Sequence, residues 1–190
     1  MQYLLPLRTS NRSVPTPPAP QPNLDLRLPS MNAIHPALGE CAPELDLSLP
    51  SAHCANAIRS TVGSWRNAPA TNPARRAIVL RIASPKESWK TTVEVTGTGN
   101  GGVVTVADVF YAINRTLRAV DGDAAVPREA RSYAACRART SPDPAHESGA
   151  RMVDRLLGHT LFAGLTPMQK HGKDKEGNFH VELSIPTRYQ

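Results

Sequence analysis

Cysteine is scarce in this sequence, and long apolar runs are absent. The three cysteines, Cys41, Cys54 and Cys136, are an odd number at unrelated spacings, unlike the even disulfide frameworks of small secreted proteins. No segment approaches the ~20 apolar residues that a membrane-spanning helix needs. The apolar start at residues 1–7 is broken by Pro6 and follows no basic segment, so it does not resemble a secretory signal. We therefore expect a soluble protein with reduced thiols, in the cytoplasm or nucleus and without a membrane partner.

The sequence also lacks a concentrated basic segment. Its formal net charge is +6, from 22 Lys and Arg against 16 Asp and Glu, and an excess of this kind can attract nucleic acid. The basic residues are scattered, however, and their densest groups lie beside acids such as Glu129, Asp174 and Glu176. This pattern is typical of a solvated surface. We expect binding to nucleic acid to be at most weak and non-specific.

Proline is abundant, at 18 of 190 residues, and it is concentrated near the N-terminus. Residues 9–22 are nearly all Ser, Thr, Asn, Pro, Ala and Gln, a composition that cannot bury enough apolar surface to offset chain entropy. Pro17 and Pro20 form a PxxP pattern, which arises readily by chance in such a segment. We interpret residues 1–30 as a disordered arm and residues 35–190 as a single folded domain.

Alternating apolar residues predict a small sheet of four or five strands. The runs that alternate are Leu45–Leu49, Ile78–Ile82, Val93–Val95 and Phe179–Ile185. The second and third runs flank a turn at residues 85–88, which predicts an antiparallel hairpin. We expect mostly loop at residues 51–74, with at most a short helical turn around residues 54–58. A polar turn is expected at residues 170–178 and a loop at residues 141–149. Residues 151–157 fit either a strand or a helix.

Two helices are predicted, and no repeating βαβ pattern accompanies them. The first spans residues 106–120, opens with a capping box at Thr105 and Asp108, and carries apolar residues at helical spacing, namely Val106, Val109, Phe110, Ile113, Leu117 and Val120. Asn114 and Arg118 are expected on its solvent side. The second helix spans residues 127–139 and is expected to bury Tyr133 and Cys136. The sequence therefore predicts an α+β fold with a mainly antiparallel sheet packed by two helices.

A glycine-rich segment, residues 97–102, reads as GxGxxG, the pattern of dinucleotide-binding loops. In those folds the helix begins inside the motif, so that its free N–H groups meet the phosphates. Here the capping signal lies later, at Thr105, and the preceding strand belongs to a hairpin. We interpret the segment as a structural loop, and we assign no cofactor to it.

Other candidates for chemistry lack the partners that they would need. His35, Cys41, His53 and Cys54 carry metal-binding atoms but do not form spaced ligand pairs, and Cys54 beside His53 is no evidence of a nucleophile and its base. Cys136 is interpreted as a small buried side chain on its helix. Asp154, flanked by arginines, is expected to form an ion pair. We assign no catalytic, cofactor-binding or metal-binding residue.

Several motifs in the same order resemble a family of uncharacterised basidiomycete fungal proteins, defined as a domain of unknown function. The matching segments cover about residues 35–165 and are residues 35–38, 45–48, 78–95, 104–109 with Ile113, 133–137, 153–158 and 162–165. The chain departs from the family at Leu45, where members often carry Trp, and in its expanded glycine loop. The resemblance implies a folded domain of fungal origin and carries no activity with it.

The sequence alone thus leaves the function unknown. We favour a non-enzymatic interaction or scaffold domain with a protein partner, because core patterning is present and a chemical constellation is not. The alternative is an enzyme whose site assembles from distant residues such as His35, Asp154 and His159. A third hypothesis is weak binding of nucleic acid through the scattered basic residues.

The proline-rich arm yields the first testable prediction. Because residues 1–30 lack apolar periodicity, we expect their deletion to leave the melting temperature of the domain nearly unchanged, and limited proteolysis to remove them first. Thermal unfolding of the full chain and the deletion variant checks this. A large fall in melting temperature would show that the arm packs on the domain.

Overall fold

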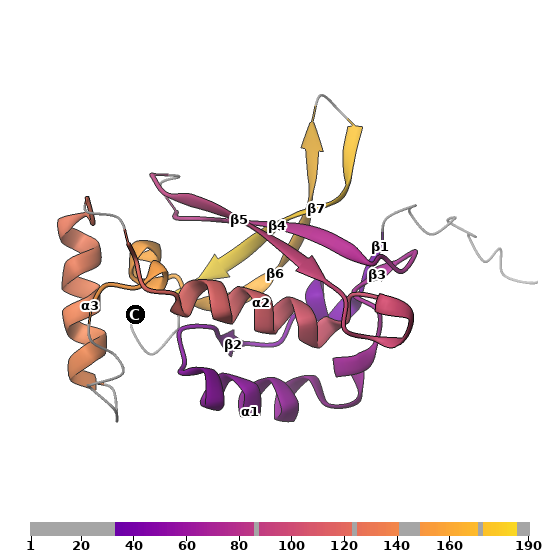
Figure 1. Ribbon diagram of the computed structural model, residues 1–190, viewed down its shortest axis with the longest axis horizontal. Coiled ribbons are helices and arrows are strands. Elements are labelled where there is room, and N and C mark those ends of the chain that lie inside the picture. The colour runs from indigo at the N-terminus through magenta and orange to yellow at the C-terminus, as the bar shows by residue number, and fades with distance from the viewer. Residues whose placement is uncertain (1–32, 86–87, 123–124, 141–148, 171–172, 186–190) are drawn as a thin grey trace, which may run out of the picture.

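A five-stranded mixed sheet and three α-helices account for most of the residues that the computed structural model describes, which are 33–85, 88–122, 125–140, 149–170 and 173–185 (Figure 1). The strands of the sheet, in spatial order, are β2 (Leu45–Asp46), β6 (Leu161–Lys170), β7 (Lys173–Ser184), β4 (Ala77–Ala83) and β5 (Lys90–Thr96). β4 and β7 are parallel, and the other neighbours are antiparallel. The short strands β1 (Ala33–Ile34) and β3 (Thr71–Asn72) form a separate antiparallel ladder. The α+β prediction is confirmed, and the expected arm at residues 1–30 lies outside the described residues.

The strongest helix signal in the sequence becomes α2 (Val106–Arg118), which fills the centre of the core. Its predicted capping box is present, with Thr105 and Asp108 each accepting a hydrogen bond from the backbone N–H of the other. Five residues of the predicted stripe are buried, namely Val106, Val109, Phe110, Ile113 and Leu117. The Phe110 ring meets the ring of Phe162 in β6 edge to face, with centroids 4.9 Å apart. Val120 lies beyond the helix and is 66% exposed, so the stripe is one turn shorter than predicted.

Residues 51–74 are not mostly loop, as the sequence predicts, because they contain α1 (Ser51–Val62) and the 3₁₀ helix η2 (Gly63–Asn67). The buried residues of α1 are Cys54, Ile58 and Val62, spaced four apart on one face. Most other positions are Ala or polar, so the apolar stripe is one residue wide and hard to recognise. α1 lies against α2 (Figure 1). Contacts with the rest of the protein, rather than local periodicity, stabilise a helix of this kind.

α2 is enclosed by the sheet on one side and by α1 on another (Figure 1). The predicted solvent side of α2 is therefore wrong at two positions. The Asn114 amide is 4% exposed and donates to the carbonyls of Leu47 and Leu49, each at 3.0 Å. Arg118 donates to the carbonyl of a residue in the same connection between β2 and α1. That connection crosses the face of α2 that the sequence assigns to solvent.

The second predicted helix is found as α3 (Arg128–Thr140), but the predicted buried face is wrong. Tyr133 is 43% exposed and Cys136 is also exposed. The reason is that α3 contacts the 3₁₀ helix η4 (Met152–Leu156) and not the sheet, so only a narrow side of α3 is covered. η4 also settles most of the open choice for residues 151–157, because residues 152–156 are helical, whereas Arg151 is extended and forms a bridge with Val120.

The strand predictions are correct in place but not always in length. The β4–β5 hairpin is confirmed, with one continuous register from Ala77 opposite Thr96 to Ala83 opposite Lys90. β2 is shorter than predicted because the Asp46 carboxylate accepts hydrogen bonds from the N–H and hydroxyl of Ser48 and turns the chain. The polar turn expected at residues 170–178 is wrong, since β6 runs to residue 170 and β7 starts at residue 173. The loop expected at residues 141–149 lies almost wholly outside the described residues.

Truncation of Phe110 tests the central position of α2. We expect Phe110→Ala to lower the free energy of unfolding by about 3–5 kcal/mol, because it removes a fully buried ring and leaves a cavity. Arg115→Ala, on the exposed part of the same helix, serves as the control and should cost no more than about 0.5 kcal/mol. Urea unfolding measures both. Equal, small losses would contradict the central role of α2.

Candidate functional site

The glycine loop at residues 97–102 is held closed by its own hydrogen bonds. The N–H of Gly97 donates to the carbonyl of Arg76, that of Gly99 to Val103, and that of Gly102 back to Gly99. A Cβ at Gly97 would lie 2.1 Å from the carbonyl carbon of Val103, so only glycine allows this crossing of the chain. Because these N–H groups already have acceptors, they do not form a cradle for phosphate. This supports the structural interpretation of the loop.

The loop is fastened to α2 by the carboxylate of Asp108, which is 9% exposed. Asp108 accepts hydrogen bonds from the N–H and hydroxyl of Thr98, at 3.1 and 2.6 Å, and from those of Thr105, at 2.9 and 2.8 Å. Burial by itself would raise the pKa of Asp108, but these hydrogen bonds outweigh burial and hold the pKa below its usual value. A carboxylate with four donors is an anchor and is poorly suited to transferring a proton.

The outer edge of β5 is the second feature of the site, because β5 is the last strand of the sheet that the described residues form. Hydrogen bonds between β5 and β4 fall at both ends of the ladder, from Gly97 N–H to the Arg76 carbonyl and from Ser84 N–H to the Trp89 carbonyl. In an antiparallel pair such bonded positions alternate, so in the continuous register the odd-numbered residues of β5 bond to β4. The N–H and C=O groups of the even-numbered residues therefore point away from the sheet.

Four residues contribute these outward groups, namely Lys90, Thr92, Glu94 and Thr96. Among the residues that the structure describes, no hydrogen-bond partner is recorded for their N–H or C=O groups. The next even-numbered residue, Thr98, donates its N–H to Asp108 instead. Asp108 thus closes the edge at one end and leaves the stretch before it open.

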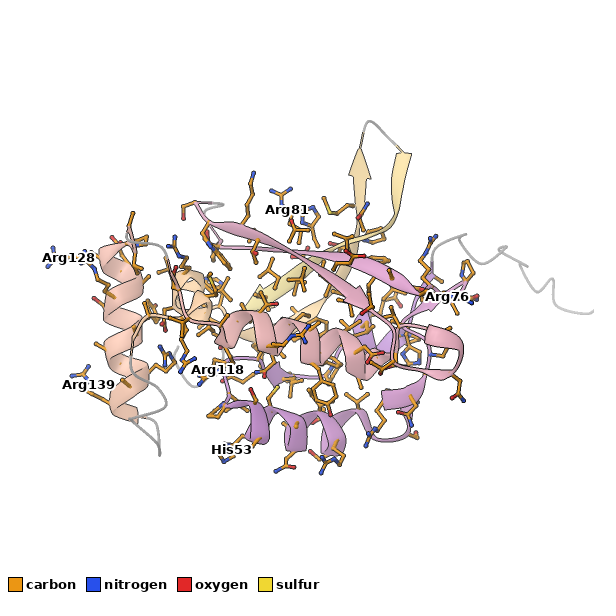
Figure 2. The ribbon with its side chains drawn as sticks, in the orientation of Figure 1. His53, Arg76, Arg81, Arg118, Arg128 and Arg139 are labelled. Carbon is orange, nitrogen blue, oxygen red and sulfur yellow. The ribbon has the colours of Figure 1, made fainter. Side chains whose placement is uncertain are left out.

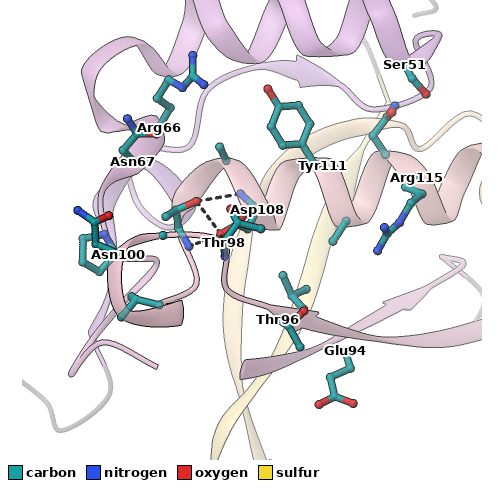
Figure 3. Close-up of a pocket in the computed structure, with 18 residues that line it drawn as sticks. Ser51, Arg66, Asn67, Glu94, Thr96, Thr98, Asn100, Asp108, Tyr111 and Arg115 are labelled. Atoms are coloured by element: carbon teal, nitrogen blue, oxygen red, sulfur yellow. Dashed lines mark hydrogen bonds between the residues drawn. The ribbon is translucent and has the colours of Figure 1, made fainter. Parts of the chain in front are cut away.

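A groove of about 920 Å³ lies beside this edge (Figure 3). Its floor is a side of α2 that includes half-buried Tyr111 and exposed Arg115, and one wall is formed by Glu94 and Thr96 of β5. The other wall comes from the start of α1 and from η2, where Arg66 lies. In Figure 3 the Arg115 side chain extends from α2 toward β5. The groove therefore combines an open strand edge with a helix surface that carries a ring and positive charge.

The residues named as an alternative enzyme site do not come together here. The Asp154 carboxylate is bonded to the Arg137 guanidinium, with contacts at 3.0 and 2.8 Å, and to the N–H of Arg151. His35 Nδ1 accepts the N–H of Ala37, its ring lies 5.9 Å from that of Trp65, and burial lowers its pKa. Neither of these residues, nor His159, lines the groove. The expected ion pair of Asp154 is confirmed.

The cysteines and histidines singled out in the sequence are also separate. His53 and Cys41 are exposed, whereas Cys54 is buried in α1. Burial, with the nearby charge of Asp46, raises the pKa of the Cys54 thiol to about 11, so the thiol is protonated and unreactive. Within the described part of the chain, no three His, Cys, Asp or Glu side chains converge as metal ligands would. The expectation that Cys136 is buried is wrong, as α3 leaves it exposed.

The motifs that carry the family resemblance around residues 133–137 and 153–158 form one structural joint. Arg137 of α3 pairs with Asp154 of η4, and Arg155 pairs with Asp121 after α2. Gly158 has a φ of +89°, and a Cβ there would lie 3.1 Å from the ring of Tyr133. These residues fasten α3 to the body of the domain, which explains their spacing without a chemical role.

Comparison with known proteins identifies a family but no function. The sequence model of a family of unknown function, DUF6699, matches residues 43–175, more than half of the chain. No curated protein and no solved structure matches. None of the helices in the described part of the chain is both long and apolar enough to cross a membrane.

Replacement of Asp108 tests its role as the anchor of the site. We expect Asp108→Asn to lower the free energy of unfolding at pH 7 by about 2–4 kcal/mol, because the amide NH₂ faces donors and the charge-assisted bonds are lost. A folded-state pKa below the unfolded value of about 3.9 means that the carboxylate stabilises the fold above that pH and loses this effect as the pH falls through the folded-state pKa. The difference between the wild type and the variant should therefore shrink in acid.

Urea unfolding at pH 7 and at about pH 3 measures this difference. Thr98→Val is the matched variant, since it removes one hydroxyl donor and leaves the carboxylate in place, and it should cost about 1 kcal/mol. A difference between Asp108→Asn and the wild type that stayed constant with pH would contradict the anchoring role.

Proposed function

Because the chain belongs to the DUF6699 family, for which no function is known, we propose its function from its own geometry. It is a protein-interaction domain that binds an extended polypeptide segment by adding it to β5 as a further strand of the sheet. This is the mode of recognition in which main-chain hydrogen bonds supply affinity and alternate side chains supply specificity.

The observation that carries the proposal is the open edge of β5. Thr92, Glu94 and Thr96 each direct one N–H and one C=O away from β4. Their spacing of two residues, about 6.7 Å along a strand, is the repeat at which a neighbouring strand offers its own donors and acceptors. An edge of this kind is a template for pairing unless it is covered.

The groove would restrict which side chains an added strand can carry on the side that faces α2. Side chains on alternate residues of such a strand would face α2, where Arg115 offers a positive charge on the side of β5 and the Tyr111 ring lies toward α1. The other side chains would lie on the exposed face beside Thr92 and Glu94. The interaction stops at Thr98, whose N–H is bound to Asp108. The edge therefore has a defined length as well as a defined chemistry.

The same contacts make the enzyme alternative less suitable. Asp108 lines the groove, but both of its oxygens accept hydrogen bonds from threonine residues. The candidates His35 and Asp154 are held by local partners outside the groove. Catalysis in the groove would need a titratable group that is free to contact a substrate there. Asp108, His35 and Asp154 do not supply such a group.

Binding of nucleic acid is proposed to be weak and non-specific. Among the basic side chains labelled in Figure 2, Arg81 extends from β4 and Arg118 from the end of α2, whereas Arg128 and Arg139 both extend from α3. The labelled arginines are therefore spread over several elements. Phosphate binding gains strength when several cations lie along one path. We also propose a basidiomycete origin, on the order of the sequence motifs, and a cytoplasmic or nuclear location, because the three cysteines are an odd number at unrelated spacings.

Proline at the centre of the edge tests the proposal. Peptides are selected from a random displayed library on the wild-type protein, synthesised, and measured by titration calorimetry. We expect Thr92→Pro to weaken their binding at least tenfold, because proline removes the outward N–H and its ring occupies the path of the added strand. Proline is compatible with an edge strand at a residue whose N–H does not bond inward, so the fold should persist.

The matched control is Thr92→Ala, which keeps the N–H and should bind within about twofold of the wild type. Hydrogen exchange supplies a second measurement, since a bound peptide should slow exchange at the amides of Thr92, Glu94 and Thr96. Selected peptides that bind Thr92→Pro as well as the wild type, or that leave these three amides unprotected, would show that binding occurs elsewhere.

A further inference from the structure

We propose that the strand which adds to β5 is β5 of a second copy of this chain. The two strands pair antiparallel about a two-fold axis, with Thr92 opposite Thr92 and with Lys90 of each copy opposite Glu94 of the other. This inference rests on the proposed function, because it names the partner of the same edge. Experiment can nevertheless distinguish the failure of strand addition at β5 from the failure of pairing with a second copy.

The backbone restricts which residues can face one another. Only even-numbered residues of β5 direct their N–H and C=O groups outward. In an antiparallel pair of two such edges, even-numbered residues must therefore stand opposite even-numbered residues to exchange both hydrogen bonds. A two-fold interface requires in addition that, if one residue meets a second, the second meets the first. Few registers satisfy both conditions.

Charge selects one register among these. Lys90 and Glu94 are both exposed and lie two residues on either side of Thr92 on the same face of the strand. Centring the pair on Thr92 places each lysine opposite a glutamate. Centring it on Glu94 or on Lys90 places like charges opposite each other, and centring it on Thr91 or on Val93 places both charged residues opposite uncharged ones. A parallel, in-register pair also opposes like charges. Opposite charges directly across a ladder are favourable and like charges are not.

The remaining side chains agree with this register. At its centre the two Thr92 side chains meet, and threonine pairs are among the favourable cross-strand pairs. On the other face, Thr91 stands opposite Val93 of the second copy, and both are half-buried β-branched residues. Neither Lys90 nor Glu94 has an ion pair recorded among the described residues. The charges are therefore available to a partner.

The size of the contact sets the expected strength. One ladder of about five to nine residues covers less than the roughly 800 Å² per partner of a typical stable interface. We therefore expect a reversible dimer whose population depends on concentration rather than a permanent one. A dimer of this kind joins two five-stranded sheets into one continuous sheet and places both α2 grooves beside the junction.

Charge exchange tests the register. Sedimentation velocity of the full chain from about 10 μM to 1 mM should show a concentration-dependent dimer. Glu94→Lys or Lys90→Glu alone should raise the dissociation constant about tenfold or more, because each places two pairs of like charges across the junction. The double variant K90E/E94K restores opposite charges and should recover the wild-type constant. A mixture of the two single variants should form a heterodimer for the same reason.

If the double variant recovers the wild-type dissociation constant, the single variants weaken the dimer through charge and not through loss of folding. Far-UV circular dichroism of each single variant provides a second check. A chain that stays monomeric to 1 mM overturns the second copy as partner, and peptide binding that Thr92→Pro abolishes would then leave the proposed function in place. A dimer that persists in Thr92→Pro, or that single charge changes leave unaltered, overturns this register and places the dimer contact elsewhere.

Discussion

The carboxylate of Asp108 is the contact on which the candidate site depends. It joins the first turn of α2 to the glycine loop, through the hydroxyls and backbone N–H groups of Thr105 and Thr98. The same bonds fix where β5 ends relative to α2. If the loop were free to move, the edge of β5 would have no fixed position beside the helix, and the groove would have no fixed width. A buried carboxylate performs this role well because its hydrogen bonds are charge-assisted.

The position of α2 follows from contacts on its other sides. Its apolar stripe meets the sheet, and Asn114 holds the connection between β2 and α1 through two backbone carbonyls. These bonds satisfy carbonyl groups in a part of the chain that is not regular structure, where unsatisfied groups would be costly. α2 is thereby left with little exposed surface, and the side that carries exposed Arg115 and half-buried Tyr111 is the floor of the groove. The groove is a consequence of how completely the rest of the helix is covered.

Sequence reasoning identifies the parts of this fold that local patterns encode. The alternation in β4 and β5 and the spacing of apolar residues in α2 are both repeated several times, so the hairpin, the helix and its cap are predicted correctly. α1 is not predicted from the sequence, because its buried face consists only of Cys54, Ile58 and Val62. The exposed face of α3 is not predicted because burial depends on what the helix packs against, and its partner is the short 3₁₀ helix η4, which follows it in the sequence. Asn114 is misplaced for the same reason.

The candidate site could not be predicted in this way, because a free edge is a property of the whole sheet. β5 is an edge strand only because β7, which is more than 75 residues later in the sequence, pairs with the other side of β4. The sequence nevertheless contains a signal, since β5 carries Lys90, Thr92 and Glu94 on its exposed face, and charges on an edge limit indiscriminate pairing. Charges of both signs exclude most strands, but they do not exclude a strand whose charges are complementary. In the proposed dimer, the residues that protect this edge therefore also define which partner it accepts.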